Sequence, residues 1–260
     1  MSVCLFSLMR DDSERLPHKM RQCIFTSNGV RTLGEAMLDN LVLWSNVLGV
    51  DYKVGITPID WDTPSHPFLS QRYYTQVREA HIIERDEESL RGETGDTIYN
   101  ENLRNHFTGY DWAVHVNACC PFLTTESLHK FLQALDFPEP RLPMTTVYEK
   151  RGFVLDHALR PIRGLKPTGL GNTKADTKYH VPCHAFHAYP NPVNTLGFAP
   201  RRFVPVQHGT EFMDIDTEED YQLAWTWSVE LHSDRRNRSP DAWGQGSSHS
   251  LSGKTAVRPV

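Results

Sequence analysis

The five residues WAVHV, at Trp112–Val116, form the most strand-like segment of this chain. Four of the five are apolar and two of these are β-branched, as in a buried central strand. Beyond Pro121 the apolar residues recur with the period of an α-helix, at i, i+3, i+4 and i+7. These residues are Leu128, Phe131, Leu132 and Leu135. We therefore expect a central strand that leads through a turn into an amphipathic helix.

The same alternation of strand and helix extends outward from this segment in both directions. Short apolar runs predict strands at residues 3–9, 52–59, 81–83, 144–149 and 185–189. Helical patterns occur at residues 67–80 and 100–107, and after a polar loop a further helix begins at Thr32. Glu35 follows Thr32 by three positions, which is the spacing of a capping box. Strands separated by helices of this length predict an α/β domain with a mostly parallel central sheet.

The bulk composition is that of a soluble globular domain. The chain has 260 residues, of which 39% are hydrophobic and 23% charged. No run approaches the roughly 18 apolar residues of a membrane span, so we expect no membrane partner. Five cysteines without a CxxC spacing argue against a disulfide scaffold and favour a reducing cytoplasmic location.

The charge is unevenly distributed along the chain. Residues 233–260 carry five Arg or Lys and two Asp or Glu, which is a net charge of +3. Because the whole chain has a net charge of −5, residues 1–232 carry −8. A domain that acidic is a poor nucleic-acid surface, so no nucleic-acid partner is expected. The last 28 residues are rich in Arg, Ser and Gly and poor in apolar residues. We therefore predict one folded domain over 1–232 and a disordered tail over 233–260.

Two carboxylates stand close together in the run EFMDIDTEED, at residues 211–220. We expect Asp214 and Asp216 at the end of an apolar strand, where residues i and i+2 point to one face. Paired carboxylates offer the hard oxygen ligands that suit Mg²⁺. The alternative is that Asp216 and Thr217 only cap the following helix, with Asp220 completing a capping box.

A polar loop that carries Arg and Lys, RDDSERLPHK at residues 10–19, follows the first predicted strand. Ligands of α/β sheets bind beyond the carboxyl ends of the strands, where this loop lies. Arg10 and Arg15 offer bidentate forks and Lys19 a point charge, which together suit a polyphosphate. The alternative is a solvated loop of mixed charge.

At these residues the chain resembles the sugar cytidylyltransferases, which activate acylneuraminate (sialic acid) and related 2-keto sugar acids as CMP conjugates. The order R-x-x-S-x-R-x-P-x-K over residues 10–19 resembles their nucleotide-binding signature, and residues 214–220 resemble their metal-binding motif. Residues 111–125 are similar to their central strand and following loop, and Glu84-Arg85 resembles a nucleotide-contacting segment.

The resemblance implies a three-layer, nucleotidyltransferase-like (Rossmann-like) fold and a Mg²⁺-dependent enzyme. Such an enzyme transfers CMP from CTP to a sugar acid or related acidic acceptor and releases pyrophosphate. The residues implied are Arg10, Ser13, Arg15, Lys19 and Arg85 for the nucleotide, Asn117 for the acceptor, and Asp214 and Asp216 for the metal. Arg10, Lys19 and Asp216 are the implied catalytic residues. Relatives are often dimers, so the resemblance also points to a homodimer.

The chain departs from this family at three places. Asp11-Asp12 stands in a loop that is usually rich in glycine, Met20 replaces an asparagine, and Cys119-Cys120 replaces hydroxyl residues. Two alternatives therefore remain: another nucleotidyltransferase or nucleotide-sugar glycosyltransferase, and a catalytically silent homologue that binds a ligand.

A further metal site is conceivable at His180, Cys183, His184 and His187. We set it aside, because in a strand His184 and His187 would face opposite sides.

Overall fold

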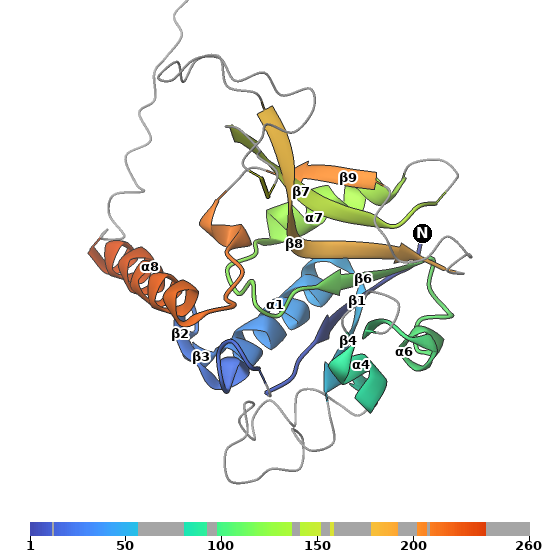
Figure 1. The fold of residues 1–260 in the computed structure, drawn as a ribbon, viewed down its shortest axis with the longest axis horizontal. Helices are drawn as coiled ribbons and strands as arrows, with labels where there is room; N and C mark the ends of the chain where they lie inside the picture. The colour runs from blue at the N-terminus through green and yellow to red at the C-terminus, as the bar shows by residue number, and fades with distance from the viewer. Residues whose placement is uncertain are drawn as a thin grey trace, which may run out of the picture.

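A seven-stranded sheet forms the centre of the molecule (Figure 1). The computed structural model describes residues 1–11, 13–56, 81–92, 98–136, 141–151, 157–158, 178–191, 202–206 and 209–237. The sheet strands are β1 (Val3–Leu8), β4 (Asp51–Ile56), β5 (Ile82–Glu84), β6 (Trp112–Val116), β7 (Met144–Arg151), β8 (Lys178–Pro190) and β9 (Arg202–Val206). Their order is β5-β4-β1-β6-β8-β7-β9, and of these seven only β8 runs antiparallel to its neighbours. The predicted α/β class and mostly parallel sheet are confirmed.

The helices begin and end at residues with clear local reasons. In α1 (Leu33–Leu48) the Thr32 side chain accepts a hydrogen bond from Glu35 N, and the Glu35 side chain accepts one from Thr32 N, each at 3.1 Å. This is the predicted capping box. The helix ends at Gly49, whose φ of 65° is left-handed and costs glycine little. The other helices are α4 (Glu87–Arg91), α6 (Glu101–Asn105), α7 (Thr125–Gln133) and α8 (Glu218–Asn237). Short 3₁₀ turns are η1 (Lys19–Arg21), η3 (Ala134–Asp136) and η5 (Thr210–Phe212).

The two faces of the sheet carry different cores. On one face, residues such as Leu5 pack with α1, α7 and the start of α8 in a large, mainly aliphatic cluster. On the other face, Phe6 packs with Tyr99 and with Phe107 just after α6 in a smaller aromatic cluster. Successive residues of β1 thus serve opposite faces, as strand geometry requires. Helices on both faces give the three layers that the sequence predicts.

The strand order places a topological switch point between β1 and β6. The chain leaves β1 toward β4 on one side, while β6 lies on the other, so the loops after β1 and β6 diverge. Ser7 is buried there, and its hydroxyl donates to the carbonyl of Val116 at 2.8 Å. Crevices of this kind are the usual ligand sites of α/β sheets.

The structure contains one element that the sequence analysis did not predict. The stretch expected to be a polar loop contains a hairpin of β2 (Cys23–Thr26) and β3 (Gly29–Thr32). α8 lies beside this hairpin (Figure 1), and the Trp225 and Phe25 rings are 5.1 Å apart. The hairpin is short, and its stability comes from this tertiary packing, which local sequence does not reveal.

Some predictions fall outside the described residues. These are the helix at 67–80 and the end of the strand at 52–59. The predicted domain boundary after residue 232 falls inside α8, which continues to Asn237. Residues 238–260 are not described, so the disordered tail stays a prediction. Among the described helices, none combines the length and apolarity that a bilayer crossing requires.

Candidate nucleotide and metal site

The loop after β1 turns its first acidic residue inward. Asp11 is 6% exposed, and its Oδ2 lies 2.6 Å from the Arg21 guanidinium and 2.9 Å from His18 Nδ1. A buried carboxylate paired with arginine does not project its charge toward a ligand. Asp11 therefore poses no obstacle to phosphate binding, while Asp12 lies outside the described residues. Met20, the other departure in this loop, is 2% exposed and belongs to the core.

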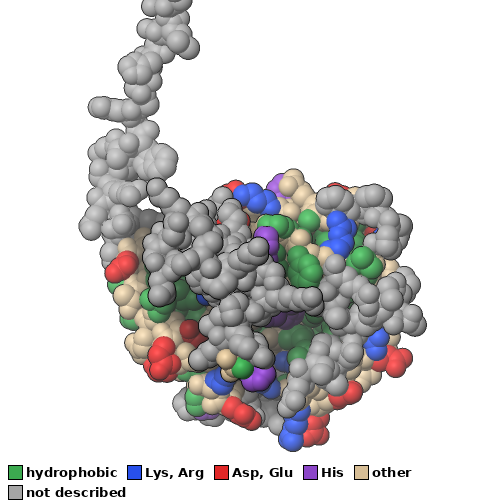
Figure 2. Space-filling model, turned by 45° about the horizontal axis from the view of Figure 1, so that its top comes forward, with side chains coloured by type: hydrophobic (Ala, Val, Ile, Leu, Met, Phe, Trp, Pro, Cys, Tyr) green, Lys and Arg blue, Asp and Glu red, His purple; other side chains and the backbone are tan. Residues whose placement is uncertain are grey.

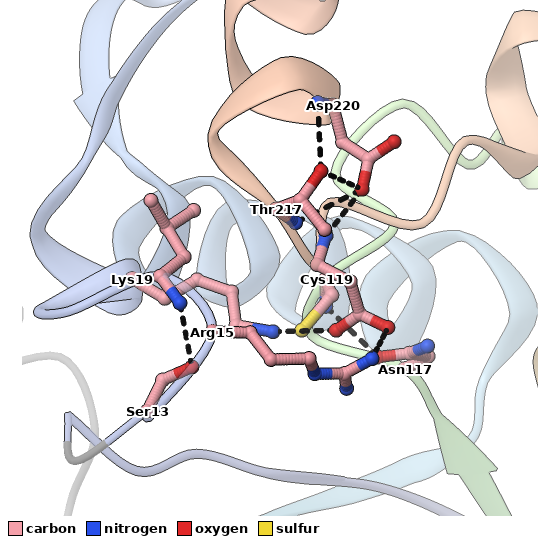
Figure 3. Close-up of polar contacts among 9 residues, drawn as sticks. Ser13, Arg15, Lys19, Asn117, Cys119, Thr217 and Asp220 are labelled. Atoms are coloured by element: carbon pink, nitrogen blue, oxygen red, sulfur yellow. Dashed lines mark hydrogen bonds and ion pairs between the residues drawn. The ribbon is translucent and has the colours of Figure 1, made fainter.

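The basic residues of this loop reach across the switch point to Asp216. Lys19 Nζ is 2.7 Å from Asp216 Oδ1, and Arg15 is 3.0 Å from Asp216 Oδ2. The Lys19 side chain is almost buried, whereas that of Arg15 is two-thirds exposed. Figure 3 shows Arg15, Lys19, Asn117 and Cys119 converging from the loops after β1 and β6. Burial alone would lower the pKa of Lys19, but Cys119 and Asp216 beside it raise the pKa above its usual value, so the amine stays charged.

The two aspartates do not end a strand, which corrects the prediction from sequence. Residues 213–217 connect η5 to α8 without regular secondary structure. Ile215 is fully buried, and its N–H donates to the Cys119 carbonyl at 2.9 Å. Asp214 and Asp216 nevertheless approach each other, since a carboxylate oxygen of each lies within 4.8 Å of the other. The predicted proximity of the two carboxylates is therefore present, although no strand forms there.

The predicted helix cap is also present, and it is formed by Thr217 and Asp220 without the Asp216 side chain. Thr217 Oγ1 accepts from Asp220 N at 3.2 Å, and Asp220 Oδ2 accepts from Thr217 N at 2.9 Å. This is a capping box in which aspartate takes the place of glutamate. Figure 3 shows the pair at the start of α8. The carboxylate of Asp216 takes no part in the cap and is left for the cations.

Asp214 is the least stabilised charged group of this cluster. Its Oδ1 is buried, and no donor among the described residues reaches it. Burial, and then the like charge of Asp216, raise the pKa of Asp214 above its usual value, against the smaller effects of Lys19 and Asn117. A buried anionic oxygen without a partner is costly. It is the kind of atom that a bound cation would stabilise.

Asn117 and Cys119 complete the site from the loop after β6. Asn117 Oδ1 accepts from Cys119 N at 2.9 Å and thereby shapes the turn. Cys119 Sγ and carboxylate oxygens of Asp214 and Asp216 all lie within 4.8 Å of one another. Burial raises the pKa of the Cys119 thiol to about 11 despite the nearby Lys19. The two carboxylates, with the unpartnered oxygen of Asp214, suit the hard divalent cation predicted from sequence.

Three predicted nucleotide residues lie apart from this cluster. Arg10 is exposed and donates to the Leu90 carbonyl at 2.6 Å, at the end of α4. Arg85 is 6% exposed and donates to the carbonyls of Met9 and Ser89, at 3.4 and 2.6 Å. A Cβ at Gly55 would lie 2.5 Å from the Leu8 side chain and 3.3 Å from the Arg85 stem, so both side chains need a glycine there. Ser13 Oγ accepts only from the loop's own backbone, at Leu16 N. The roles of all three toward a nucleotide stay predictions.

A cavity of about 310 Å³ opens on the aromatic face of the sheet. Its lining includes Phe6, Tyr99, His115, His184, His187 and Tyr189. Of these residues, His184 is near enough to Asp214 to have a small lowering effect on the pKa of that carboxyl, and its ring lies 5.4 Å from that of His187. Burial lowers the pKa of His115 to about 3 and that of His187 to about 4, so both rings are neutral at physiological pH. Figure 2 shows histidine and hydrophobic side chains side by side on one surface of the molecule.

The stacking of His184 on His187 contradicts the expectation that they face opposite sides of a strand. His184 has a left-handed φ of 52°, and the pairing of β7 with β8 shifts register between Thr145 and Val147. This bulge turns His184 onto the side of His187. Sequence reasoning also missed the position of His115 in the cavity and the proximity of Cys119 to the two aspartates. The adjacency of Asn117 and Cys119 to a central strand end was the available signal.

Comparisons with known proteins define the fold. No family model matches this chain, and no curated protein matches it in sequence. A CMP:2-keto-3-deoxy-manno-octonic acid synthetase complexed with CTP is similar in structure, with TM-score 0.56 and 15% identity over 90% of this chain and 100% of that one. A 4-diphosphocytidyl-2C-methyl-D-erythritol synthase from Anaerococcus prevotii gives TM-score 0.52 and 14% identity over 87% and 95%. The chain therefore has the nucleotidyltransferase-like fold of these two synthetases.

Proposed function

We propose that the protein is a divalent-metal-dependent cytidylyltransferase that transfers CMP from CTP to a small acidic acceptor and releases pyrophosphate. The observation that carries this proposal is the convergence of Lys19, Asp214 and Asp216 at the switch point of the sheet. Both similar structures are named as synthetases of cytidylyl compounds, and one is complexed with CTP. A sugar acid of the acylneuraminate type is the acceptor that the sequence motifs favour.

The chain's own residues supply charge neutralisation and position. Lys19 is fixed, nearly buried and charged, so it can hold a phosphate oxygen at a set place. The exposed Arg15 is free to turn from Asp216 toward the phosphates, where its fork binds two oxygens. Mg²⁺ or a similar ion, held by Asp214 and Asp216, would supply further charge for the phosphoryl centre. Transfers of this kind depend on positioning and electrostatics more than on covalent catalysis.

The acceptor is proposed to lie between Asn117 and the histidine-lined cavity. This places its attacking oxygen beside the two carboxylates, because His184 and Asn117 both adjoin Asp214. The described lining of the cavity holds aromatic, aliphatic and histidine side chains and no lysine or arginine. It therefore suits the uncharged body of an acceptor, whose acidic group would face the cluster of Lys19 and Arg15.

A thermal-shift titration tests the proposal without knowledge of the acceptor. The full chain is titrated with CTP, UTP, ATP and GTP, each with and without Mg²⁺. A ligand at 100 times its dissociation constant adds about 2.7 kcal/mol, which in a domain of this size raises the midpoint by roughly 5–10 °C. We expect this shift with CTP and metal together.

Other outcomes separate the alternatives. A shift with UTP instead of CTP would point to a different donor, as in a nucleotide-sugar glycosyltransferase. No shift with any nucleotide would contradict the proposal and favour a silent homologue. Lys19→Met is the matched control, since it should remove the CTP shift while the core stays intact.

A further inference from the structure

A sulfur atom completes the cluster of donors at the metal site. Cys119 Sγ stands within 4.8 Å of carboxylate oxygens of both Asp214 and Asp216, and no other such group of three exists among the described residues. Donor atoms around one tetrahedral ion lie about 3–4 Å apart. Small side-chain rotations therefore bring all three atoms onto a single ion.

The backbone fixes this arrangement, so it is more than a chance approach of surface groups. The loop after β6 and the connection before α8 are joined by the hydrogen bond from Ile215 N to Cys119 O, at 2.9 Å. The side chain of Asn117 holds Cys119 N at 2.9 Å and sets the turn that aims the thiol. Ile215 anchors the opposite side of the connection in the core.

A second, independent observation points to a cation. The buried Oδ1 of Asp214 has no hydrogen-bond donor within the described part of the chain. Native proteins rarely leave a buried anionic oxygen without a partner. The unpartnered atom belongs to the cluster that contains the thiol.

The charges of the cluster also accommodate a thiolate. Lys19 and Arg15 balance the two carboxylates through their contacts with Asp216. A divalent ion bound by the carboxylates alone would leave an excess of two positive charges. When sulfur also binds, the thiol proton passes to solvent and the excess falls to one.

Sulfur changes which ion the site prefers. Mg²⁺ takes oxygen ligands almost exclusively, whereas Co²⁺ and Zn²⁺ bind thiolate together with carboxylate. We propose that Cys119 is a thiolate ligand beside Asp214 and Asp216, and that the site prefers a sulfur-accepting divalent ion such as Co²⁺ or Zn²⁺ to Mg²⁺. The inference rests on the proposed function only in taking this metal site as that of the transferase.

Cobalt absorption tests the inference directly. The full chain is titrated with Co²⁺, and the near-ultraviolet sulfur-to-cobalt charge-transfer band is recorded together with the affinity. We expect a saturable band in the wild type and its loss in Cys119→Ser. The Co²⁺ affinity of that variant should fall by about tenfold or more, while its Mg²⁺ affinity changes less.

The neighbouring cysteines provide matched controls. Cys120→Ala changes an adjacent but core-facing thiol, and Cys23→Ser changes a partly exposed thiol of the hairpin. Both should keep the band, and circular dichroism checks that each variant is folded. A wild type that binds Co²⁺ without the band, or a Cys119→Ser variant with unchanged Co²⁺ affinity, would overturn the inference.

The result is independent of the nucleotide. If the band forms but CTP gives no thermal shift, the metal site stands and the proposed function fails. If CTP and Mg²⁺ stabilise the protein but no band forms, the function stands and the thiolate ligand is excluded.

Discussion

Two buried cations lie near the carboxyl end of β1, and their partners differ in kind. Arg85 donates to the carbonyls of Met9 and Ser89, which are fixed by the backbone. Lys19 donates to the side chain of Asp216, a partly exposed carboxylate on the connection before α8. A cation held by the backbone stabilises the fold, whereas a cation held by a movable carboxylate is available to a ligand. Burial alone therefore does not separate structural from functional charges.

The most direct test of this comparison removes the carboxylate that pairs with Lys19. Asp216→Asn should lower metal-dependent turnover by about 10²–10³-fold, the usual cost of one electrostatic contact in an active site. Stability should fall by about 1–2 kcal/mol, because the exposed Arg15 contributes little but the nearly buried Lys19 loses a charged partner. Turnover is measured as pyrophosphate release from CTP and stability by urea unfolding.

Thr217→Ala is the control for that variant. It removes only the helix cap, so it should cost about 1 kcal/mol of stability and leave turnover near the wild-type value. Undiminished turnover in Asp216→Asn would exclude Asp216 from the metal site. Helix capping would then be the remaining role of residues 211–220.

Replacing Arg85 should mainly reduce the stability of the protein. Arg85→Met strands the buried carbonyls of Met9 and Ser89, so the free energy of unfolding should fall by roughly 2–4 kcal/mol. The control, Arg15→Met, removes an exposed cation and should cost under about 1 kcal/mol. If both variants lose the same stability in urea, the contrast between backbone-held and side-chain-held cations is wrong.

The smallest expected effect concerns the strained carboxylate. Because the pKa of Asp214 is raised in the fold, its ionised form destabilises the metal-free protein above that pKa. Asp214→Asn should therefore raise the thermal midpoint in chelator at neutral pH. The gain should shrink as the pH falls through the raised pKa toward the ordinary value of 3.8.

Added metal should reverse the order of the two thermal midpoints, so that the wild type melts at a higher temperature than Asp214→Asn. Divalent ion stabilises the wild type by binding its native state, while the variant lacks one ligand. Equal midpoints in chelator at neutral pH would show that Asp214 is not strained.

Much of the frame could be predicted from local sequence. The strand at Trp112–Val116 and the helix capped by Thr32 and Glu35 occur where their patterns place them. Both depend on interactions within a few residues, namely apolar periodicity and the pairing of a cap with the third helical position.

The partners of the charged residues could not be predicted from local sequence. Lys19 and Asp216 are 197 positions apart, and Arg85 contacts a carbonyl 76 positions away. Sequence gave Arg10, Arg85 and Lys19 the same kind of role. The structure separates them, because the partner of each cation is set by how distant loops meet.

The sequence by itself determined the α/β class, the central strand and the two carboxylates before α8, because these follow from residue type and short-range periodicity. Tertiary structure alone decided that Asp11 turns inward to Arg21, and that Cys119 meets the carboxylates. It also decided that a bulge brings His184 onto His187. The physical reason is that burial, pairing and ligand geometry depend on which segments the sheet order brings together, and that information is spread over the whole chain.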